Sequence, residues 1–169
     1  MSAPLTRHIH SAPIAPGNSV RIESRVAYVS LQMVRKRGGG AERLTYPEPF
    51  VVDPGAGITK LSLQLALLSE DEGGWDLDVG TDRRQVLLVT AAGRREVLAH
   101  YGSVRVKFPS CDERFEFKCL FVDDWPPETP PLLGLHDVLD FVRITFDKTP
   151  VPRHHTFGNV IFERYDPSP

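Results

Sequence analysis

Apolar and polar residues alternate at every second position along much of this chain, and this period limits the fold more than any other feature. It is the period of a β-strand with one buried face. Two such runs flank a turn over residues 109–114, and their apolar members are Val104, Val106, Phe108, Phe115, Phe117, Cys119 and Phe121. Neither a helix nor a central strand would tolerate the proline-rich residues 125–131. The chain is therefore predicted to be all-β.

An earlier pair of strand-like runs predicts a second hairpin. Residues 86–90 and 95–101 flank the sequence Ala91-Ala92-Gly93-Arg94, whose small side chains are typical of a hairpin tip. Together with the runs described above, this gives the succession of short strands and turns that is expected of an all-β domain.

The remaining segments are less strongly patterned. Residues 61–68 fit either an alternating strand or a helix, and both interpretations stay open. The acidic, glycine-containing residues 69–84 predict a surface loop. Residues 136–140 are compatible with one short helix, which precedes strands over residues 142–146 and 160–162.

Size and composition indicate one globular domain. The chain has 169 residues, of which 41% are hydrophobic and 25% are charged, and this is enough to bury a core. Residues 1–19 are rich in Pro, Ala and Ser and are expected to form a flexible N-terminal arm. Residues 20–169 are expected to form the single domain.

Charge and hydropathy argue against several kinds of partner and site. A net charge of -2 with scattered basic residues gives no reason to expect nucleic acid as a partner. No apolar run approaches the ~20 residues of a membrane helix, and none at the N-terminus resembles a signal peptide, so no membrane partner and a cytoplasmic location are expected. Cys111 and Cys119 are expected to be reduced thiols, and without a Cys-x-x-Cys spacing neither a metal nor a cofactor is expected.

Residues 50–59 lead from an apolar strand through one aspartate into a turn of small residues. Phe50-Val51-Val52 precede Asp53, and Pro54-Gly55-Ala56-Gly57 follow it. Asp, Pro and Gly each favour a turn for separate reasons, so a turn is the minimal interpretation. A buried strand that ends in this way also holds the carboxylate at the floor of a cleft.

Three features follow one another along the chain: the Asp53 turn, the hairpin with a small-residue tip and the late sequence Leu132-Leu133-Gly134. With these features in this order, the chain resembles the retroviral-type (retropepsin-like) aspartic proteases, in particular their bacterial members. The resemblance covers about residues 20–163. It implies a closed β-barrel or sandwich with a flap hairpin and one short helix. It also implies Asp53 as the catalytic residue and a peptide or protein as substrate. The substrate-binding residues that it implies are Gly55, Ala56, Thr90, Ala91, Ala92 and Gly93.

The resemblance implies a homodimer because the chemistry of this family needs two carboxylates in contact. Like charges so close cannot both ionise, so the pair holds one proton between them. Asp78-Val79-Gly80 offers the nearest second aspartate, but Trp75-Asp76-Leu77 before it is no buried apolar strand. Asp53 from each of two chains would therefore form the pair, in a cleft on the two-fold axis.

Three positions depart from the family pattern and leave alternative functions open. Pro54 stands where relatives carry a Thr or Ser whose hydroxyl braces the two active-site turns, and Leu135 and Gly57 replace an Arg and an acid that pair in many relatives. The leading hypothesis is an aspartic endopeptidase. The alternative is an inactive protein of the same fold that binds peptides or dimerises. A third possibility is an unrelated β-barrel binding domain.

Overall fold

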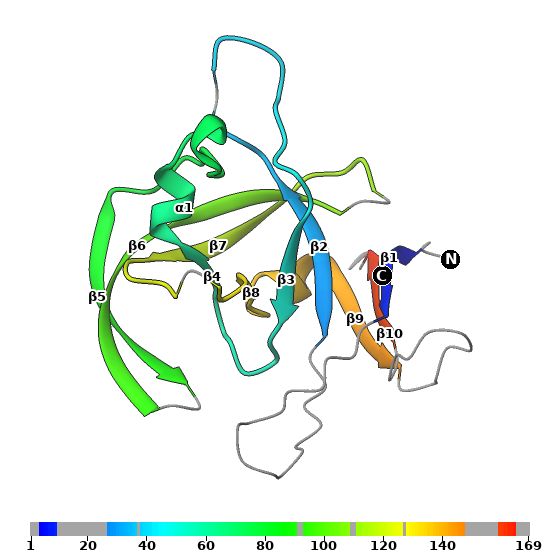
Figure 1. The fold of residues 1–169 in the computed structure, drawn as a ribbon. Helices are drawn as coiled ribbons and strands as arrows, with labels where there is room; N and C mark the ends of the chain where they lie inside the picture. Colours follow the sequence, from blue (N-terminus) through cyan, green and yellow to red (C-terminus); the bar gives the residue numbers. More distant parts are fainter. Residues whose placement is uncertain are drawn as a thin grey trace.

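The computed structural model describes residues 4–9, 27–36, 38–90, 93–108, 111–126, 128–147 and 159–164, and it is mostly β-structure, as the alternating pattern predicts (Figure 1). The strands are β1 (Pro4–Ile9), β2 (Tyr28–Met33), β3 (Glu48–Val52), β4 (Thr59–Ser62), β5 (Asp82–Thr90), β6 (Gly93–Lys107), β7 (Phe115–Val122), β8 (Leu132–Leu133), β9 (Val142–Asp147) and β10 (Asn159–Arg164). The helices are α1 (Leu63–Leu67), the 3-10 turn η1 (Glu70–Glu72) and α2 (Val138–Phe141).

Seven strands form the main sheet, in the order β2-β3-β8-β4-β7-β6-β5, and a further pairing joins β2 to β6. This last pairing turns six of the strands into a ring and leaves β5 at its outer edge. The ring is held by one residue pair between β4 and β8 and by two between β2 and β6, so it is not a regular closed barrel.

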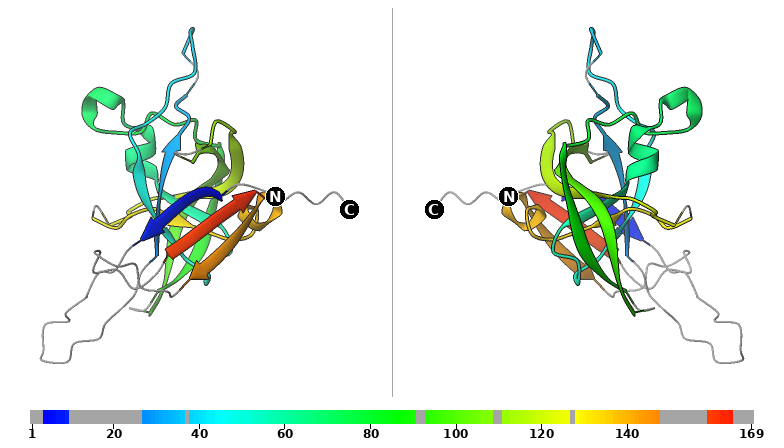
Figure 2. Two further views of the ribbon diagram at one scale, coloured as in Figure 1. Left: turned by 90° about the vertical axis from the view of Figure 1, so that its right-hand side faces the viewer. Right: turned by 90° about the vertical axis from the view of Figure 1, so that its left-hand side faces the viewer.

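A second sheet contains three strands in the order β1-β10-β9. Figure 2 shows these strands side by side on one side of the molecule, with the β5–β6 hairpin on the opposite side. Strand β1 comes from within the expected N-terminal arm and pairs with β10 from Pro4 to Ile9. The rest of residues 1–19 lies outside the described residues, so the flexibility of the arm stays a prediction.

Both predicted hairpins are confirmed, and the helices differ from expectation. Strand β5 pairs with β6 up to Thr90 and Gly93, and β6 pairs with β7 over eight residue pairs. Residues 61–68 combine both interpretations, because β4 ends at Ser62 and α1 begins at Leu63, with the Ser62 hydroxyl capping the helix. The single short helix was therefore an underestimate, since the described residues contain both α1 and α2.

The main hydrophobic core lies on one face of the large sheet and beneath the small one. Fully buried aromatic rings from four segments meet there, and they are Phe50, Phe108, Phe117, Phe121 and Phe162. Residues 69–84 are not only a surface loop, because Trp75 and Leu77 are buried in the same core. Their N–H groups donate to the carbonyls of Leu65 and Ala66, and these bonds fold the segment back along α1.

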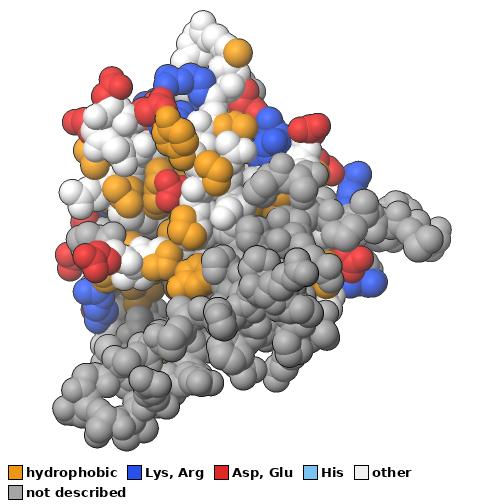
Figure 3. All heavy atoms as spheres, turned by 45° about the vertical axis from the view of Figure 1, so that its right-hand side comes forward, with side chains coloured by type: hydrophobic (Ala, Val, Ile, Leu, Met, Phe, Trp, Pro, Cys, Tyr) orange, Lys and Arg blue, Asp and Glu red, His pale blue; other side chains and the backbone are white. Residues whose placement is uncertain are grey.

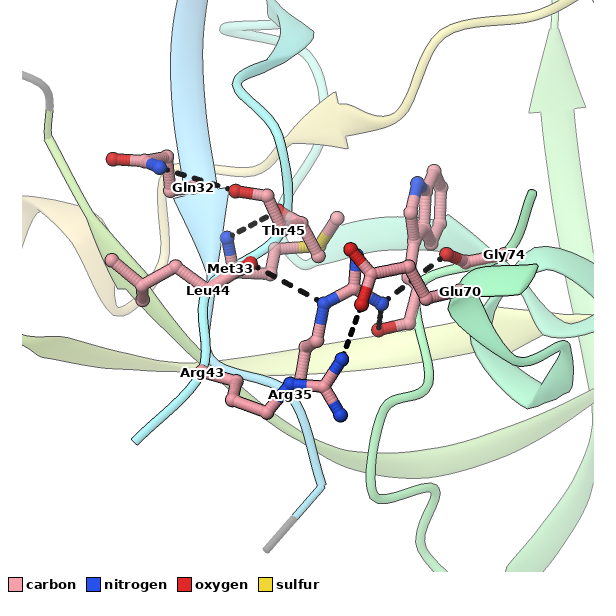
Figure 4. Close-up of polar contacts among 9 residues, drawn as sticks. Gln32, Met33, Arg35, Arg43, Leu44, Thr45, Glu70 and Gly74 are labelled. Carbon is pink, nitrogen blue, oxygen red and sulfur yellow. Dashed lines mark hydrogen bonds and ion pairs between the residues drawn. The ribbon is translucent and has the colours of Figure 1, made fainter. Parts of the chain in front are cut away.

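A buried arginine fastens this segment to the end of β2 (Figure 4). The side chain of Arg35 is 3% exposed, and its guanidinium donates to the carbonyls of Leu44 (3.3 Å) and Trp75 (3.1 Å). It also pairs with Glu70 at 3.4 Å. A buried guanidinium is tolerated where its donors are satisfied in this way, so Arg35 acts as a structural tie.

We expect Arg35→Met to lower the free energy of unfolding by about 2 kcal/mol, because the carbonyls of Leu44, Gly74 and Trp75 lose their donor. Urea denaturation followed by tryptophan fluorescence measures the change. The matched control is Arg43→Met, since Arg43 pairs with the same Glu70 but is 62% exposed. It should cost less than about 1 kcal/mol. Equal losses in the two variants would show that the buried contacts of Arg35 contribute no more to stability than the exposed ion pair of Arg43.

Charged side chains of both signs are interspersed on the described part of the face shown in Figure 3, with hydrophobic side chains between them. One local network joins Glu42 to Arg114 at 2.7 Å and to Arg105 at 3.3 Å. The hydrogen bond from Arg114 and the positive charge of both arginines hold the pKa of Glu42 below its ordinary value. None of the helices in the described ranges is both long and apolar enough to cross a membrane.

Candidate active site

The Asp53 turn closes on itself through hydrogen bonds of its own. The Oδ1 atom of Asp53 accepts from the N–H of Gly55 at 2.9 Å, and the Asp53 carbonyl accepts from the N–H of Ala56 at 3.0 Å. Pro54 is exposed, has no N–H to satisfy and stiffens the turn by fixing its own φ. A Cβ on Gly55 would lie 3.2 Å from the same Oδ1, so the glycine leaves room for the carboxylate. The carboxylate of Asp53 is thus oriented by the turn.

Strand β8 lies between the two strands that the Asp53 turn connects. It runs parallel to β3, with Val51 opposite Leu132, and antiparallel to β4, with Lys60 opposite Leu132. The N–H of Asp53 donates to the carbonyl of Leu133 at 3.2 Å. The two sequence motifs that carry the resemblance, 80 residues apart along the chain, therefore meet at Asp53.

Residues that follow β8 hold the far side of the same turn. The N–H of Leu135 donates to the carbonyl of Ala56 at 3.0 Å, and the N–H of His136 donates to the carbonyl of Gly57 at 2.8 Å. Ala56 is buried at 4% exposure, so its backbone is fixed from both sides. The turn is therefore bound to the late segment at Asp53, Ala56 and Gly57.

Gly134 is required at this crossing because there is no room for a side chain. A Cβ on Gly134 would lie 2.2 Å from the carbonyl carbon of Ile58 and 2.5 Å from the nitrogen of Thr59. The N–H of Gly134 donates to Oγ1 of Thr59 at 3.2 Å, and Thr59 is 2% exposed. The glycine permits the close approach, and the buried threonine satisfies the amide that this approach removes from water.

The outer face of the sheet carries a second hydrophobic cluster, called here the outer cluster. Its buried members are Leu88, Ala99, Leu120 and Val122, and its half-buried members are Ile58, Val86, Val97, Tyr101 and Trp125. The core residues of β3 are Phe50 and Val52, so alternation turns Val51 away from the main core and places Asp53 on the side of the outer cluster. The predicted catalytic residue thus borders an apolar surface.

Lys60 is a residue of this site that the sequence analysis missed. It pairs with Leu120 of β7, an outer-cluster residue, while its neighbour Leu61 belongs to the main core. Its ammonium donates to the carbonyl of Ile58 at 3.4 Å. Burial lowers the pKa of Lys60, and the negative charge of Asp53 acts in the opposite direction, which places the two side chains within electrostatic reach. The sequence did contain one indication of this residue, a lysine within a strand whose other residues are buried.

The predicted flap is the β5–β6 hairpin, and its end lies at the same end of the molecule as the turn between β3 and β4 (Figure 1). Thr90 and Gly93 are its last paired residues, and Gly93 has a φ of 124°, which favours glycine. Ala91 and Ala92 lie outside the described residues. Of the predicted substrate-binding residues, Gly55 and Ala56 share the Asp53 turn, and the hairpin residues belong to a separate element.

The second aspartate considered in the sequence lies in another part of the surface. Asp78 lines a groove of about 540 Å³ together with Arg35, Gly80, Arg105 and Glu116, and the described lining of this groove includes no residue of the Asp53 turn. In the parts of the chain that the structure describes, no cluster of three or more His, Cys, Asp or Glu side chains could hold a metal ion.

Neither a protein-family model nor a curated protein matches this chain. The chemistry is therefore argued from the geometry of the site. One oriented carboxylate beside an apolar surface can accept a proton from water or bind a donor, but alone it provides no acid for the leaving group. A second carboxylate would complete an acid and base pair.

Proposed function

We propose that this protein is a homodimeric retropepsin-like aspartic endopeptidase. The observation that carries the proposal is the position of β8, which lies between β3 and β4 and binds the backbone of Asp53 through Leu133. This position brings the two motifs of the resemblance together in one site. The same sheet continues into the β5–β6 hairpin, which could cover a bound peptide.

Asp53 from each of two chains would supply the two carboxylates. One, ionised, takes a proton from the water that attacks the peptide carbonyl, while the other, protonated, polarises that carbonyl. The carbon–nitrogen bond then breaks and the amine leaves with a proton from the pair. The hydrogen bond from Gly55 orients each carboxylate before substrate arrives, which lowers the cost of reorganisation during the reaction.

The β5–β6 hairpin would act as the flap. Its paired strands end at Thr90 and Gly93, and the small residues of its sequence there would let the backbone of a peptide approach closely. An extended substrate would then be held between this hairpin and the Gly55–Ala56 backbone by hydrogen bonds of the β type.

Pro54 favours a second candidate, an inactive protein of the same fold that binds peptides or dimerises. It carries no hydroxyl with which to brace a partner's turn, so two turns would lose hydrogen bonds worth about 1 kcal/mol each. In the proposed enzyme this loss would be offset by the stiffness of the proline ring, by the bond from Asp53 to the Leu133 carbonyl and by the bonds from the Leu135 and His136 amides.

Casein, an unstructured protein, serves as the test substrate at acid to neutral pH. The proposal predicts that the wild-type protein cleaves it, that a statine-type inhibitor blocks the cleavage, and that Asp53→Asn does not cleave. Identical behaviour of wild type and Asp53→Asn would favour the non-catalytic candidate.

A further inference from the structure

One row of side chains crosses five strands of the main sheet and places a lysine among apolar residues. The strand register aligns them in the order Val51, Leu132, Lys60, Leu120 and Tyr101. Side chains of paired residues lie on the same face of a sheet, so this row belongs to the outer face, beside Asp53. Lys60 stands at its centre, between two leucines.

Lys60 has no partner that would justify this position structurally. None of the ion pairs among the described residues includes it, and its one hydrogen bond, to the carbonyl of Ile58, is 3.4 Å long. Two arginines of this face are engaged elsewhere: Arg84 pairs with Asp82, and Arg95 pairs with Asp124. Asp53 is near enough for its negative charge to act on Lys60, but no carboxylate of the described residues lies within ion-pair distance of the half-buried ammonium, which therefore keeps capacity to bind one.

Lys60 at this position lowers the stability of the protein without bound substrate. Its neighbours in the row remove water from the ammonium, and burial is the main cause of its lowered pKa. Met has a similar unbranched shape and would pack between the same leucines without this desolvation. A charge kept where an apolar residue would stabilise the fold indicates a role in binding.

We propose that Lys60 determines substrate specificity and selects peptides that carry Asp or Glu at the position bound over the row of outer-face residues. The leucines on either side contact the aliphatic part of that side chain, and the ammonium binds its carboxylate. This inference rests on the proposed function in taking the outer face beside Asp53 as the peptide-binding surface. It adds the chemical class of the residue that is recognised.

The test uses decapeptides whose six central residues are randomised, with bound peptides and cleaved peptides sequenced separately. For wild type we expect Asp and Glu to be enriched at one position, and an individual Glu peptide to bind about tenfold more tightly than its Gln counterpart. Lys60→Met should remove this preference and raise the thermal stability. Lys60→Glu should reverse it in favour of Lys and Arg. The matched control, Lys36→Met, removes a charge from the groove that contains Asp78 and should leave the preference unchanged.

The readouts separate the two hypotheses. Peptides that are bound with an acidic preference but never cleaved would support the role of Lys60 and contradict the enzyme. Cleavage without an acidic preference, a preference that persists in Lys60→Met, or no bound peptide at all would each overturn the role of Lys60. The reversal in Lys60→Glu is the decisive result, because a merely structural lysine would not exchange one charge preference for the other.

Discussion

Asp53→Asn is expected to lower the rate of peptide cleavage by at least about a thousandfold, the scale of loss when a group that acts in the chemical step is removed. Asparagine keeps an Oδ1 atom that can accept the hydrogen bond from Gly55, so the turn and the fold should survive. It cannot ionise or hold the shared proton, so the loss should be in kcat with little change in KM. Initial rates on a fluorogenic peptide, with circular dichroism to verify folding, measure the effect.

The matched control is Asp78→Asn, the same substitution in another Asp-x-Gly sequence of the chain. Asp78 is exposed in a groove away from the Asp53 turn, and its replacement should leave the rate within about twofold of wild type. If Asp78→Asn lost activity and Asp53→Asn kept it, the active site would have been assigned to the wrong aspartate.

Gly134→Ala is expected to lower the free energy of unfolding by more than about 3 kcal/mol, because overpacking against backbone cannot be relieved by a rotamer change. The added Cβ would lie 2.2 Å from the carbonyl carbon of Ile58, so β8 and the start of β4 must separate. That movement would also break the bond between the Gly134 amide and Thr59 and displace the Asp53 turn. Urea denaturation should show the loss, and cleavage should fail even where the protein still folds.

Gly57→Ala is the control within the same turn, since a Cβ on Gly57 meets nothing within 4 Å. Its stability should stay within about 0.5 kcal/mol of wild type. Equal stability of Gly134→Ala and Gly57→Ala would mean that β8 does not cross the Asp53 turn as closely as described.

The local features of the fold could be predicted from the sequence because they depend on neighbours along the chain. Alternation is a local pattern, and it predicted the β5–β6 and β6–β7 hairpins. The turn at Asp53 was equally local, because Asp, Pro and Gly favour turns wherever they occur. Its closure by the Gly55 amide follows from the same short sequence.

The features that the sequence did not reveal depend on residues far apart in the chain. The crossing of β8 over the Asp53 turn joins residues about 80 positions apart, and only the close approach of Gly134 to Ile58 explains why glycine is needed there. Lys60 lies in an apolar row only because two other strands, β7 and β8, place leucines beside it. The burial of Arg35 depends on the carbonyls of Gly74 and Trp75, which no local pattern brings near.

The central claim is that one active site contains Asp53 from two chains, and the most direct test mixes wild-type protein with Asp53→Asn. At a fixed total concentration, after subunits have exchanged, random pairing makes the number of all-wild-type dimers follow the square of the wild-type fraction. An equal mixture should therefore show about a quarter of the wild-type cleavage rate if both carboxylates are needed. A rate of about one half would mean that each chain works alone, and would contradict the shared site.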